Sequence, residues 1–459
     1  MPECRGAEGR LRCRLVRRWH HQPGADEVIS ETGTETIVLK AATVVPPSAA
    51  NARPLSWLAP RTGCHLDGRI SDEHASAPNS ARVSILSACN DAVPDHGEDY
   101  LDGNQSIRAP FTRAYFGAAA AILATKPSPA DARVLGELLL RHYGLTGTVR
   151  VLSSEVECTA EVALWNGDRL ILKTSAQPEG RDSFRFQVAA LAGLEGTCGF
   201  AVPHIVRTGS GTLMFEEEDV CGYLQTRLSG VPLHQANATP DVLYRVGQAL
   251  GRLNLALEPL TLPAVHRPVL WHVGCWPRLM ELEKHLPTGA VADSVRLSMS
   301  NYVELIEPQL REIGWQVTHN DPSPFNTLLT DNGVAFIDFG DGCWGPRIQD
   351  LAIAASHMVT DPSLALGGAE NLIAGYASVL PLSALEANLL VGLIKARQSA
   401  LILINYWRAG LFPAEAAYIK KNVARAERGL SILSALDVGE AEMLCVARCL
   451  SPRGGPPSV

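Results

Sequence analysis

The chain has 459 residues, with 40 Lys and Arg against 48 Asp and Glu and a formal net charge of −8. Hydrophobic residues make up 46% and charged residues 19%, which excludes a wholly disordered or fibrous chain. The mildly acidic balance lacks the basic footprint of a general nucleic-acid binder, so no nucleic-acid partner is expected. The most apolar stretches, 116–124 and 389–404, are too short to span a membrane or are interrupted by Lys395 and Arg397. We therefore expect no membrane partner either.

Eleven cysteines are scattered through the chain, and no two of them form a Cys-x-x-Cys pair. The closest two, Cys445 and Cys449, do not indicate a zinc site or a disulfide scaffold. Scattered thiols suit a reducing compartment. The first twenty residues hold six arginines and two acids, but they lack a regular apolar face and a secretory hydrophobic run. A cytoplasmic protein is therefore expected, with an organelle-targeting peptide as the alternative.

Residues 1–127 show no sustained period of either 3.6 or 2. Short apolar runs such as 36–45 lie between clusters of Pro, Ser, Asn, Asp and Gly, as at 76–80 and 95–104. This pattern predicts an extension that is largely disordered. A small independent domain is the alternative, and nothing in these residues indicates its function.

The pattern changes at Ser128, which offers a hydroxyl N-cap, followed by a proline for the first helical position and an acid in the first turn. A helix is predicted to begin there and to end near Gly144. A hairpin turn is predicted at Asn166-Gly167-Asp168. The remaining predicted elements of residues 128–228 are short strands and one helix: strands at 148–152, 161–165, 170–174, 205–206 and 223–228, and a helix at 182–194.

From about residue 229 the pattern is mainly helical. An apolar face predicts a helix beyond Pro240, and further helical stretches are expected at 290–314 and from 382 onward. Strands first and helices later predict a two-lobed α+β fold. Its lobes would be 128–228 and 229–450, followed by a tail at 451–459.

The segment most informative about chemistry is 317–341, which reads VTHNDPSPFNTLLTDNGVAFIDFGD. Two short apolar runs are separated by Asp331-Asn332-Gly333, which predicts a β-hairpin. Such a hairpin would place Asn326 and Asp338 at its open end, side by side or one step out of register. An amide oxygen and a carboxylate held that close are suitable ligands for Mg²⁺.

The same region offers the other groups that phosphoryl transfer requires. Asp321 lies on the loop that enters the hairpin, where its carboxylate can orient an acceptor hydroxyl and take its proton. Lys173, flanked by apolar strand residues, supplies a cation for the phosphates. His319 is predicted to hold the loop, and Asp341 either to recognise substrate or to cap the loop. Alone, Asp321 would be a turn residue and Lys173 a solvated lysine, so the prediction depends on their ordered combination.

This segment resembles the kinase-like phosphotransferases of the aminoglycoside phosphotransferase superfamily, and within it the hydroxylysine kinase group. The resemblance covers residues 131–408. The stretches that carry it are His319-Asn320-Asp321 with Asn326, residues 337–341, 350–354, 138–145 and 223–233, His266-Arg267 with Trp271, and Ala396-Arg397.

The resemblance implies a bilobed protein-kinase-like fold with a small β-rich N-lobe and a larger helical C-lobe. It also implies transfer of the γ-phosphate of ATP or GTP to an alcohol, with Mg²⁺ as the cofactor. The hydroxylysine group uses GTP and an amino-acid hydroxyl. By match of position, Asp321 would be the catalytic base. Asn326 and Asp338 would be the Mg²⁺ ligands, and Lys173 would contact the phosphates. The nucleobase would be read by backbone groups at Thr226, Arg227 and Leu228.

Four features depart from the pattern of the family. The loop after Asp321 contains Pro322-Ser323-Pro324-Phe325, which is stiffer than usual. The phosphate-covering loop at 153–159 carries Glu155 and Glu157, which would repel a triphosphate unless they point away. Gln187 stands where a carboxylate partner of the strand lysine is often found. His272 follows a tryptophan where an aspartate is usual.

The leading prediction is a small-molecule kinase whose acceptor is 5-hydroxy-L-lysine or a related amino alcohol or amino acid. Aminoglycoside, homoserine and choline-like acceptors are alternatives. Asp341 and Asp350 are expected to suit an acceptor that carries an ammonium group. From a different class, the second hypothesis is a catalytically impaired kinase-fold protein that binds nucleotide without turnover. The choice between ATP and GTP, and the oligomeric state, stay open.

Overall fold

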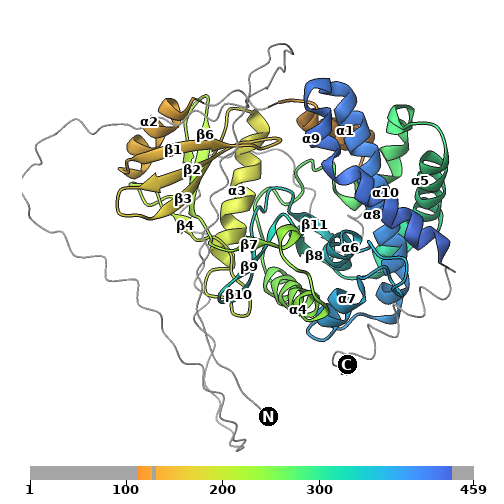
Figure 1. The fold of residues 1–459 in the computed structure, drawn as a ribbon. Coiled ribbons are helices and arrows are strands. Elements are labelled where there is room, and N and C mark those ends of the chain that lie inside the picture. Colours follow the sequence, from red (N-terminus) through yellow and green to blue (C-terminus); the bar gives the residue numbers. More distant parts are fainter. Residues whose placement is uncertain (1–110, 127–130, 437–459) are drawn as a thin grey trace, which may run out of the picture. The chain divides into compact units, whose positions relative to one another are not determined.

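The computed structural model describes residues 111–126 and 131–436 (Figure 1). The expectations for residues 1–110, for 127–130 and for the tail at 451–459 lie outside these described residues. Within them, strands gather in the first part and helices dominate the second. This is the bilobed protein-kinase-like α+β fold expected from the sequence.

The N-lobe is built on an antiparallel sheet, which has six strands within the described residues, in the order β1-β2-β3-β6-β4 with β5 paired to β6. Its strands are β1 (Gly147–Leu152), β2 (Cys158–Leu164), β3 (Arg169–Ser175), β4 (Ile205–Val206), β5 (Phe215–Glu216) and β6 (Cys221–Thr226). The predicted turn at 166–168 joins β2 to β3, and Asn166 Oδ1 accepts a hydrogen bond from Asp168 N at 3.0 Å. The register pairs Lys173 of β3 with Thr159 and Tyr223, in the interior of the sheet.

Two helices accompany this sheet. Helix α2 (Ala132–Tyr143) packs its apolar face on β1 and the neighbouring strands, and helix α3 (Pro178–Gly193) contacts β3 and β6. The start of α2 differs from the prediction: its N-cap is Asp131, which accepts from Arg133 N at 2.8 Å, and not Ser128. The predicted end is confirmed, because Gly144 adopts a left-handed φ of 64° that favours glycine.

The C-lobe is mainly helical. Its α-helices are α4 (Pro240–Leu257), α5 (Ala290–Asn301), α6 (Ile348–Ser356), α7 (Glu370–Ala377), α8 (Ala384–Leu411), α9 (Ala416–Ile419) and α10 (Val423–Ala435). Shorter 3₁₀ or π segments are η3 (Leu233–Gln235), η4 (Val273–His285), η5 (Tyr302–Ile306), η6 (Glu307–Glu312), η7 (Pro413–Glu415) and η8 (Lys420–Asn422). The helical stretch predicted at 290–314 is confirmed, but only α5 is α-helical: the chain continues as the π segment η5 and the 3₁₀ segment η6 to Glu312.

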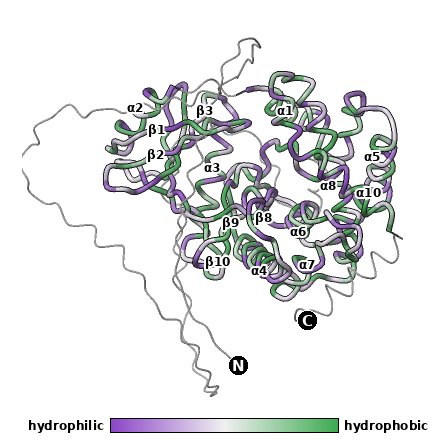
Figure 2. The backbone as a smooth tube through the Cα atoms, in the orientation of Figure 1, coloured by the Kyte–Doolittle hydropathy of each residue, from purple (hydrophilic) through white to green (hydrophobic). Residues whose placement is uncertain are grey.

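Helix α8 forms much of the C-lobe core. It begins with a capping box, in which Ser383 and Glu386 bond each other's backbone N–H groups. By length and composition it could cross a membrane, yet 83% of its most apolar window is buried within the protein. That burial is typical of a core helix. In Figure 2, hydrophobic and hydrophilic residues alternate along the amphipathic helix α4, as expected for a helix with one buried face.

Short strands between the helices position the loops of the site. Strands β9 (Thr327–Thr330) and β10 (Gly333–Phe336) form the predicted hairpin, and β7 (Val231–Pro232) pairs with β9. Strand β8 (Trp315–Thr318) pairs with β11 (Cys343–Pro346). The chain between β8 and β9 is the loop that carries Asp321.

One helix forms where the sequence analysis expected only extension. Helix α1 (Arg113–Leu123) buries Phe116, Ala119 and Leu123 in the core of the C-lobe. Tyr115 Oη donates to Arg267 O at 2.8 Å, which fixes the helix beside the cleft. The prediction of an extension over 1–127 is thus wrong for this part: a nearly uniform apolar sequence has no polar face, so it shows no period although its tertiary contacts order it.

Candidate functional site

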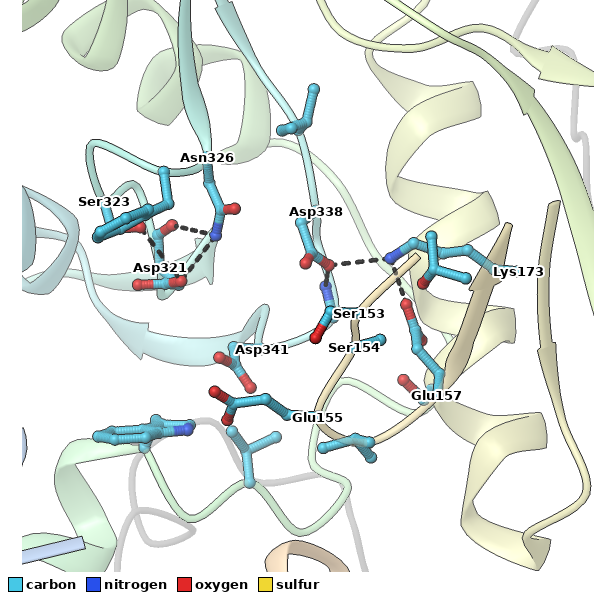
Figure 3. Close-up of a pocket in the computed structure, with 18 of the residues that line it drawn as sticks. Ser153, Ser154, Glu155, Glu157, Lys173, Asp321, Ser323, Asn326, Asp338 and Asp341 are labelled. Carbon is cyan, nitrogen blue, oxygen red and sulfur yellow. Dashed lines mark hydrogen bonds and ion pairs between the residues drawn. The ribbon is translucent and has the colours of Figure 1, made fainter. Parts of the chain in front are cut away.

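A cavity of about 950 Å³ lies between the two lobes. Its N-lobe wall comes from the loop after β1, from β3 and from the start of α3. Its C-lobe wall comes from the loop after β8, the end of the β9–β10 hairpin and the middle of α8. Figure 3 shows Asp321 and Asn326 on one side, Lys173 on the other, and Asp338 between them.

Asp350, near the start of α6, anchors the loop between β8 and β9. Its fully buried carboxylate accepts hydrogen bonds from His319 N (3.0 Å), Asn320 N (2.7 Å) and Asn254 Nδ2 (2.7 Å). Asn320 adopts a left-handed φ of 62°, which is uncommon for a residue other than glycine and turns the chain toward Asp321. Asp350 therefore supports the loop, and the expectation that it faces an acceptor ammonium group is wrong.

His319 holds the same loop from the side. Its Nδ1 accepts from Asp321 N at 3.2 Å, and its Nε2 lies 3.1 Å from Ile337 O at the end of the hairpin. The ring also packs on Phe339, with centroids 4.5 Å apart. Burial lowers the pKa of His319, so the imidazole is neutral at pH 7. These contacts are those of the supporting residue that the sequence predicted.

Asp321 presents its carboxylate to the cavity. Oδ2 accepts from Asn326 Nδ2 at 2.7 Å and from Ser323 Oγ at 3.4 Å, and Oδ1 lies 3.5 Å from Arg397 Nη2. Burial raises the pKa of Asp321 well above its usual value; Arg397 opposes this rise and Asp341 adds to it. A carboxylate with a raised pKa in a cleft is a better proton acceptor than a solvated one.

Asn326 and Asp338 lie at the open end of the hairpin, one step out of register. The backbone shows this directly, because Ile337 N donates to Asn326 O at 2.9 Å. Since Asn326 Nδ2 points to Asp321, its Oδ1 is left for another partner. Asp338 is half exposed to the cavity and has a left-handed φ of 65°. A strained non-glycine residue at such a point is typical of a functional site.

This donor set fits a hard cation. One amide oxygen and one carboxylate are too few to enclose Mg²⁺, but Mg²⁺ is usually held by one or two protein ligands together with phosphate oxygens and water. Asn326 and Asp338 are therefore suited to a metal that arrives with phosphates.

Lys173 crosses the cleft to the same hairpin. Its buried ammonium group lies 2.9 Å from Asp338 Oδ1 and forms a close ion pair with Glu157. Gln187 Oε1 accepts a further hydrogen bond from Lys173 at 3.2 Å. Desolvation opposes the charge, but the two carboxylates outweigh it and raise the pKa of Lys173 well above its usual value. The lysine is thus charged and held where it can reach an anionic substrate.

The Lys173 charge also acts on its hairpin partner. Removal of water by the cleft walls raises the pKa of Asp338, but Lys173 and the Gly340 N–H group outweigh this, and the pKa of Asp338 lies below its usual value. Asp338 is therefore ionised at neutral pH. An ionised carboxylate is the form that binds a cation.

Asp341 lines the cavity, near Glu155 (Figure 3). Burial and the Asp338 charge raise the pKa of Asp341 to about 7. Its backbone carbonyl accepts from Asn320 Nδ2 at 3.0 Å. The backbone of Asp341 thus helps to fix the loop, while its carboxyl group remains in the cavity. Both predicted roles, loop support and substrate recognition, stay predictions.

Thr226, Arg227 and Leu228 line the cavity at the end of β6. The Thr226 N–H donates to His204 O at 2.9 Å and the Arg227 N–H to Arg169 O at 3.0 Å. The Arg227 side chain is 3.2 Å from Glu161. Two of the backbone donors in this segment are thus already used within the protein.

Four residues that matter to the site were missed or misread in the sequence. Glu157 forms an ion pair with Lys173, and Glu155 forms one with Arg408 of α8. Arg397, from the middle of α8, touches Asp321 although 76 positions separate them. His272, which replaces an aspartate, still caps η4 by accepting from Gly274 N at 2.8 Å. Only the acids of the 153–159 loop carried a readable signal.

The sequence profile of the phosphotransferase enzyme family, APH, matches residues 148–382, which include Lys173, Asp321, Asn326 and Asp338. The chain belongs to this family. This phosphotransferase acts on a hydroxyl group, and its acceptor is a small molecule.

Curated relatives of the phosphotransferase include two kinds of kinase. A hydroxylysine kinase from Danio rerio is 25% identical over 339 residues, which cover 69% of this chain and 95% of that protein. A homoserine kinase from Pseudomonas aeruginosa is 30% identical over 226 residues, which cover 48% of this chain and 66% of that protein. The alignment with the zebrafish protein is the more extensive of the two.

A solved structure confirms the fold. An amicoumacin kinase in complex with AMP-PNP, Ca²⁺ and Ami superimposes with a TM-score of 0.52 at 15% identity. The match covers 67% of this chain and 95% of that one. At this identity the likeness establishes the bilobed fold of the phosphotransferase and leaves the substrates to be argued from the site.

Proposed function

We propose that this phosphotransferase transfers the γ-phosphate of ATP or GTP to the hydroxyl group of 5-hydroxy-L-lysine or a related amino alcohol or amino acid. The observation that carries the proposal is the placement of Asp321 beside Asn326 in the cleft, opposite the charged Lys173. The alignment with a hydroxylysine kinase over 95% of that protein supports the choice of acceptor. Homoserine is the nearest alternative, supported by the Pseudomonas aeruginosa relative.

In the proposed mechanism Asp321 Oδ1 accepts the proton of the acceptor hydroxyl as its oxygen attacks the γ-phosphorus. The bond between the γ-phosphorus and the β–γ bridging oxygen breaks, and the nucleoside diphosphate leaves. Lys173 holds the phosphates of the donor by charge. Asn326 and Asp338 would hold Mg²⁺, which when bound neutralises phosphate oxygens. The protein thus works by positioning and charge, with no covalent intermediate.

The nucleobase is proposed to lie against residues 226–228. Since the backbone N–H groups of Thr226 and Arg227 are bonded within the protein, Leu228 is the residue of this segment whose N–H group we assign to the base. A cytoplasmic location is part of the proposal. It is supported by the free state of all five cysteines within the described residues, which are Cys158, Cys198, Cys221, Cys275 and Cys343.

The test is nucleoside diphosphate release by the purified protein with Mg²⁺, with ATP and GTP in parallel. The acceptors are 5-hydroxylysine, homoserine, a choline-type amino alcohol and an aminoglycoside. We expect turnover that depends on 5-hydroxylysine or another amino-acid hydroxyl and that Asp321→Asn abolishes. If nucleotide raises the melting temperature with Mg²⁺ but no acceptor stimulates turnover, the proposal is wrong and the nucleotide-binding hypothesis replaces it.

A further inference from the structure

Arg397 of α8 is buried in the wall of the cavity, with a side chain 4% exposed. Its guanidinium lies over the Trp271 ring at 4.5 Å, and Nη2 is 3.5 Å from Asp321 Oδ1. Within the described residues, neither Nε nor Nη1 has a hydrogen-bond partner. Arginine cannot be deprotonated in a protein, so this is a buried cation whose N–H groups are largely unsatisfied.

A second buried polar group without a partner lines the same cavity. His357, which caps the end of α6, is 6% exposed, and its Nε2 has no hydrogen-bond partner in the part of the chain that the structure describes. Burial lowers the pKa of His357 well below its usual value, and the Arg425 and Arg397 charges add to this. The imidazole is therefore neutral. Together the two side chains leave three buried nitrogens in the cavity lining without a partner among the described residues: Nε and Nη1 of Arg397 and Nε2 of His357.

Buried donors without partners are costly, and a buried cation is more costly still. Asp321 does not satisfy Arg397, because only one oxygen approaches it, at 3.5 Å, and the other bonds Asn326. An oxyanion brought by a ligand would satisfy it. That ligand has two possible sources: the carboxylate of the acceptor and the γ-phosphate of the nucleotide.

The position of Arg397 favours the acceptor. Lys173, the cation that suits phosphates, lies on the far side of Asp338 from Asp321 (Figure 3). Arg397 contacts Asp321 itself, and its ring partner Trp271 and its neighbour Leu401 also belong to the C-lobe wall. The carboxyl group of Asp341 lies close enough to act electrostatically on Arg397. This part of the cavity therefore offers an acidic and a basic side chain, as a zwitterionic ligand requires.

We propose that Arg397, with His357 beside it, binds the carboxylate of the acceptor and so selects an amino acid over an amino alcohol. The inference rests on the proposed function and narrows it: the acceptor is a hydroxylated amino acid in its zwitterionic form. Acceptors that lack a carboxylate, such as choline-type alcohols and aminoglycosides, leave the donors of Arg397 without a partner. Charge-assisted hydrogen bonds of this kind usually change binding by roughly 10- to 100-fold.

The test compares each acceptor with its amide. Nucleoside diphosphate release is measured with 5-hydroxy-L-lysine and with its α-carboxamide, which keeps the hydroxyl and both amines. We expect the acid to have a KM roughly 10- to 100-fold lower than the amide in the unmodified protein. Arg397→Met should remove that difference by raising the KM of the acid. Arg425→Met is the matched control, because it removes a nearby charge that does not line the cavity.

A binding measurement separates this inference from the proposed function. Calorimetry with L-lysine and L-lysinamide, in the presence of a non-hydrolysable nucleotide, reports carboxylate recognition without any transfer. Binding of L-lysine that is lost in Arg397→Met supports the carboxylate site even if hydroxylysine is not turned over. Turnover of hydroxylysine with equal KM for acid and amide overturns the carboxylate site while leaving the kinase in place. If neither amino acid binds nor hydroxylysine reacts, both proposals fail.

Two further outcomes also overturn the inference. If Arg397→Met weakens binding of ATP but not of ADP, the oxyanion is the γ-phosphate. If it lowers kcat equally for acid and amide with no change in KM, Arg397 only positions Asp321, and ordered water satisfies its remaining donors. Should Arg397→Met not fold, Arg397→Lys keeps the charge, and we expect it to retain part of the preference for the acid. Nucleotide-induced thermal stabilisation checks the fold of each variant.

Discussion

Glu157, from the loop between β1 and β2, forms the ion pair with Lys173 across the N-lobe. In the sequence, Gln187 of α3 stands where a carboxylate partner of such a lysine is often found. In the structure Gln187 serves as a neutral hydrogen-bond acceptor, since its Oε1 accepts from Lys173 at 3.2 Å and from Tyr223 Oη at 2.7 Å. The anionic partner of Lys173 thus comes from the loop between β1 and β2 and not from helix α3. This loop therefore helps to hold the lysine in place.

Glu157→Gln should therefore weaken nucleotide binding. Without its carboxylate the Lys173 ammonium loses one of two anionic partners in a buried position, so it is less firmly held for the phosphates. We expect the KM for the nucleotide to rise by roughly tenfold, the size of one charge-assisted contact. Steady-state kinetics with varied nucleotide measure this. The exposed Glu137→Gln on α2 is the control, and equal KM values for both variants would contradict the prediction.

Asp321→Asn should separate binding from transfer. The amide keeps the shape of the side chain but cannot accept the hydroxyl proton, so turnover should fall by about 10²- to 10⁴-fold. Mg²⁺-dependent nucleotide binding should persist, because Asn326, Asp338 and Lys173 are unchanged. Parallel measurements of turnover and of nucleotide-induced thermal shift decide the matter. Normal turnover in the variant would remove Asp321 from the base role.

Asp338→Ala should act on binding itself. Its carboxylate is the anionic member of the proposed metal pair and also the 2.9 Å partner of Lys173. We expect the thermal stabilisation by nucleotide with Mg²⁺ to be lost, as it should be when EDTA is added to the unmodified protein. A shift that persists in the variant but disappears with EDTA would place the metal elsewhere.

Asp350→Ala tests the anchor below the catalytic loop. Removing this buried acceptor leaves the N–H groups of His319 and Asn320 and the Asn254 amide without a partner. We expect a loss of about 2–4 kcal/mol of stability in chemical denaturation. We also expect lower kcat at unchanged nucleotide KM, since the loop positions Asp321. The exposed Asp241→Ala on α4 should change neither property, and an Asp350 variant of normal stability would exclude the anchor.

The ion pair of Glu386 with Arg347 predicts that the stability of the protein depends on pH. Burial raises the pKa of Glu386, but its hydrogen bonds with Arg347 outweigh this, and the pKa lies below its usual value. A pKa lower in the folded than in the unfolded protein contributes stability above the unfolded pKa. That contribution is lost as the pH falls through the folded pKa. Glu386→Gln should therefore lower the melting temperature at pH 7, and the difference from the unmodified protein should shrink below about pH 4. A difference independent of pH would exclude the linkage.

Features that depend on neighbouring residues could be predicted from the sequence. The Asn166-Gly167 turn and the hairpin around Asn332-Gly333 followed from short-range backbone preferences. So did the end of α2 at Gly144. The hairpin in turn placed Asn326 and Asp338 together, because strand register is fixed once the turn is known. The proximity of Asn326 and Asp338 could thus be predicted from about a dozen consecutive residues.

Features that depend on packing between distant segments could not be predicted. Helix α1 is ordered by burial of Phe116 and Leu123, and its uniformly apolar sequence gives no helical period. The contact between Arg397 and Asp321 joins separate elements whose approach no local pattern specifies. By contrast, the ion pair between Glu157 and Lys173 lies beside the Cys158–Thr174 pair of the predicted hairpin, and it was missed because Glu157 was considered only as a charge near phosphates.

Arg408 forms an ion pair with Glu155 and donates from Nε to Leu123 O at 3.3 Å. One side chain of α8 thus ties down the loop at 153–159 and the end of α1. On the proposed function, in which this loop covers the phosphates, the tie would have to break and form again each time the diphosphate leaves. We therefore expect release of the nucleoside diphosphate, and not the chemical step, to be rate-limiting. Weakening the ion pair between Arg408 and Glu155 would then raise kcat at saturating substrate and lower the affinity for nucleotide.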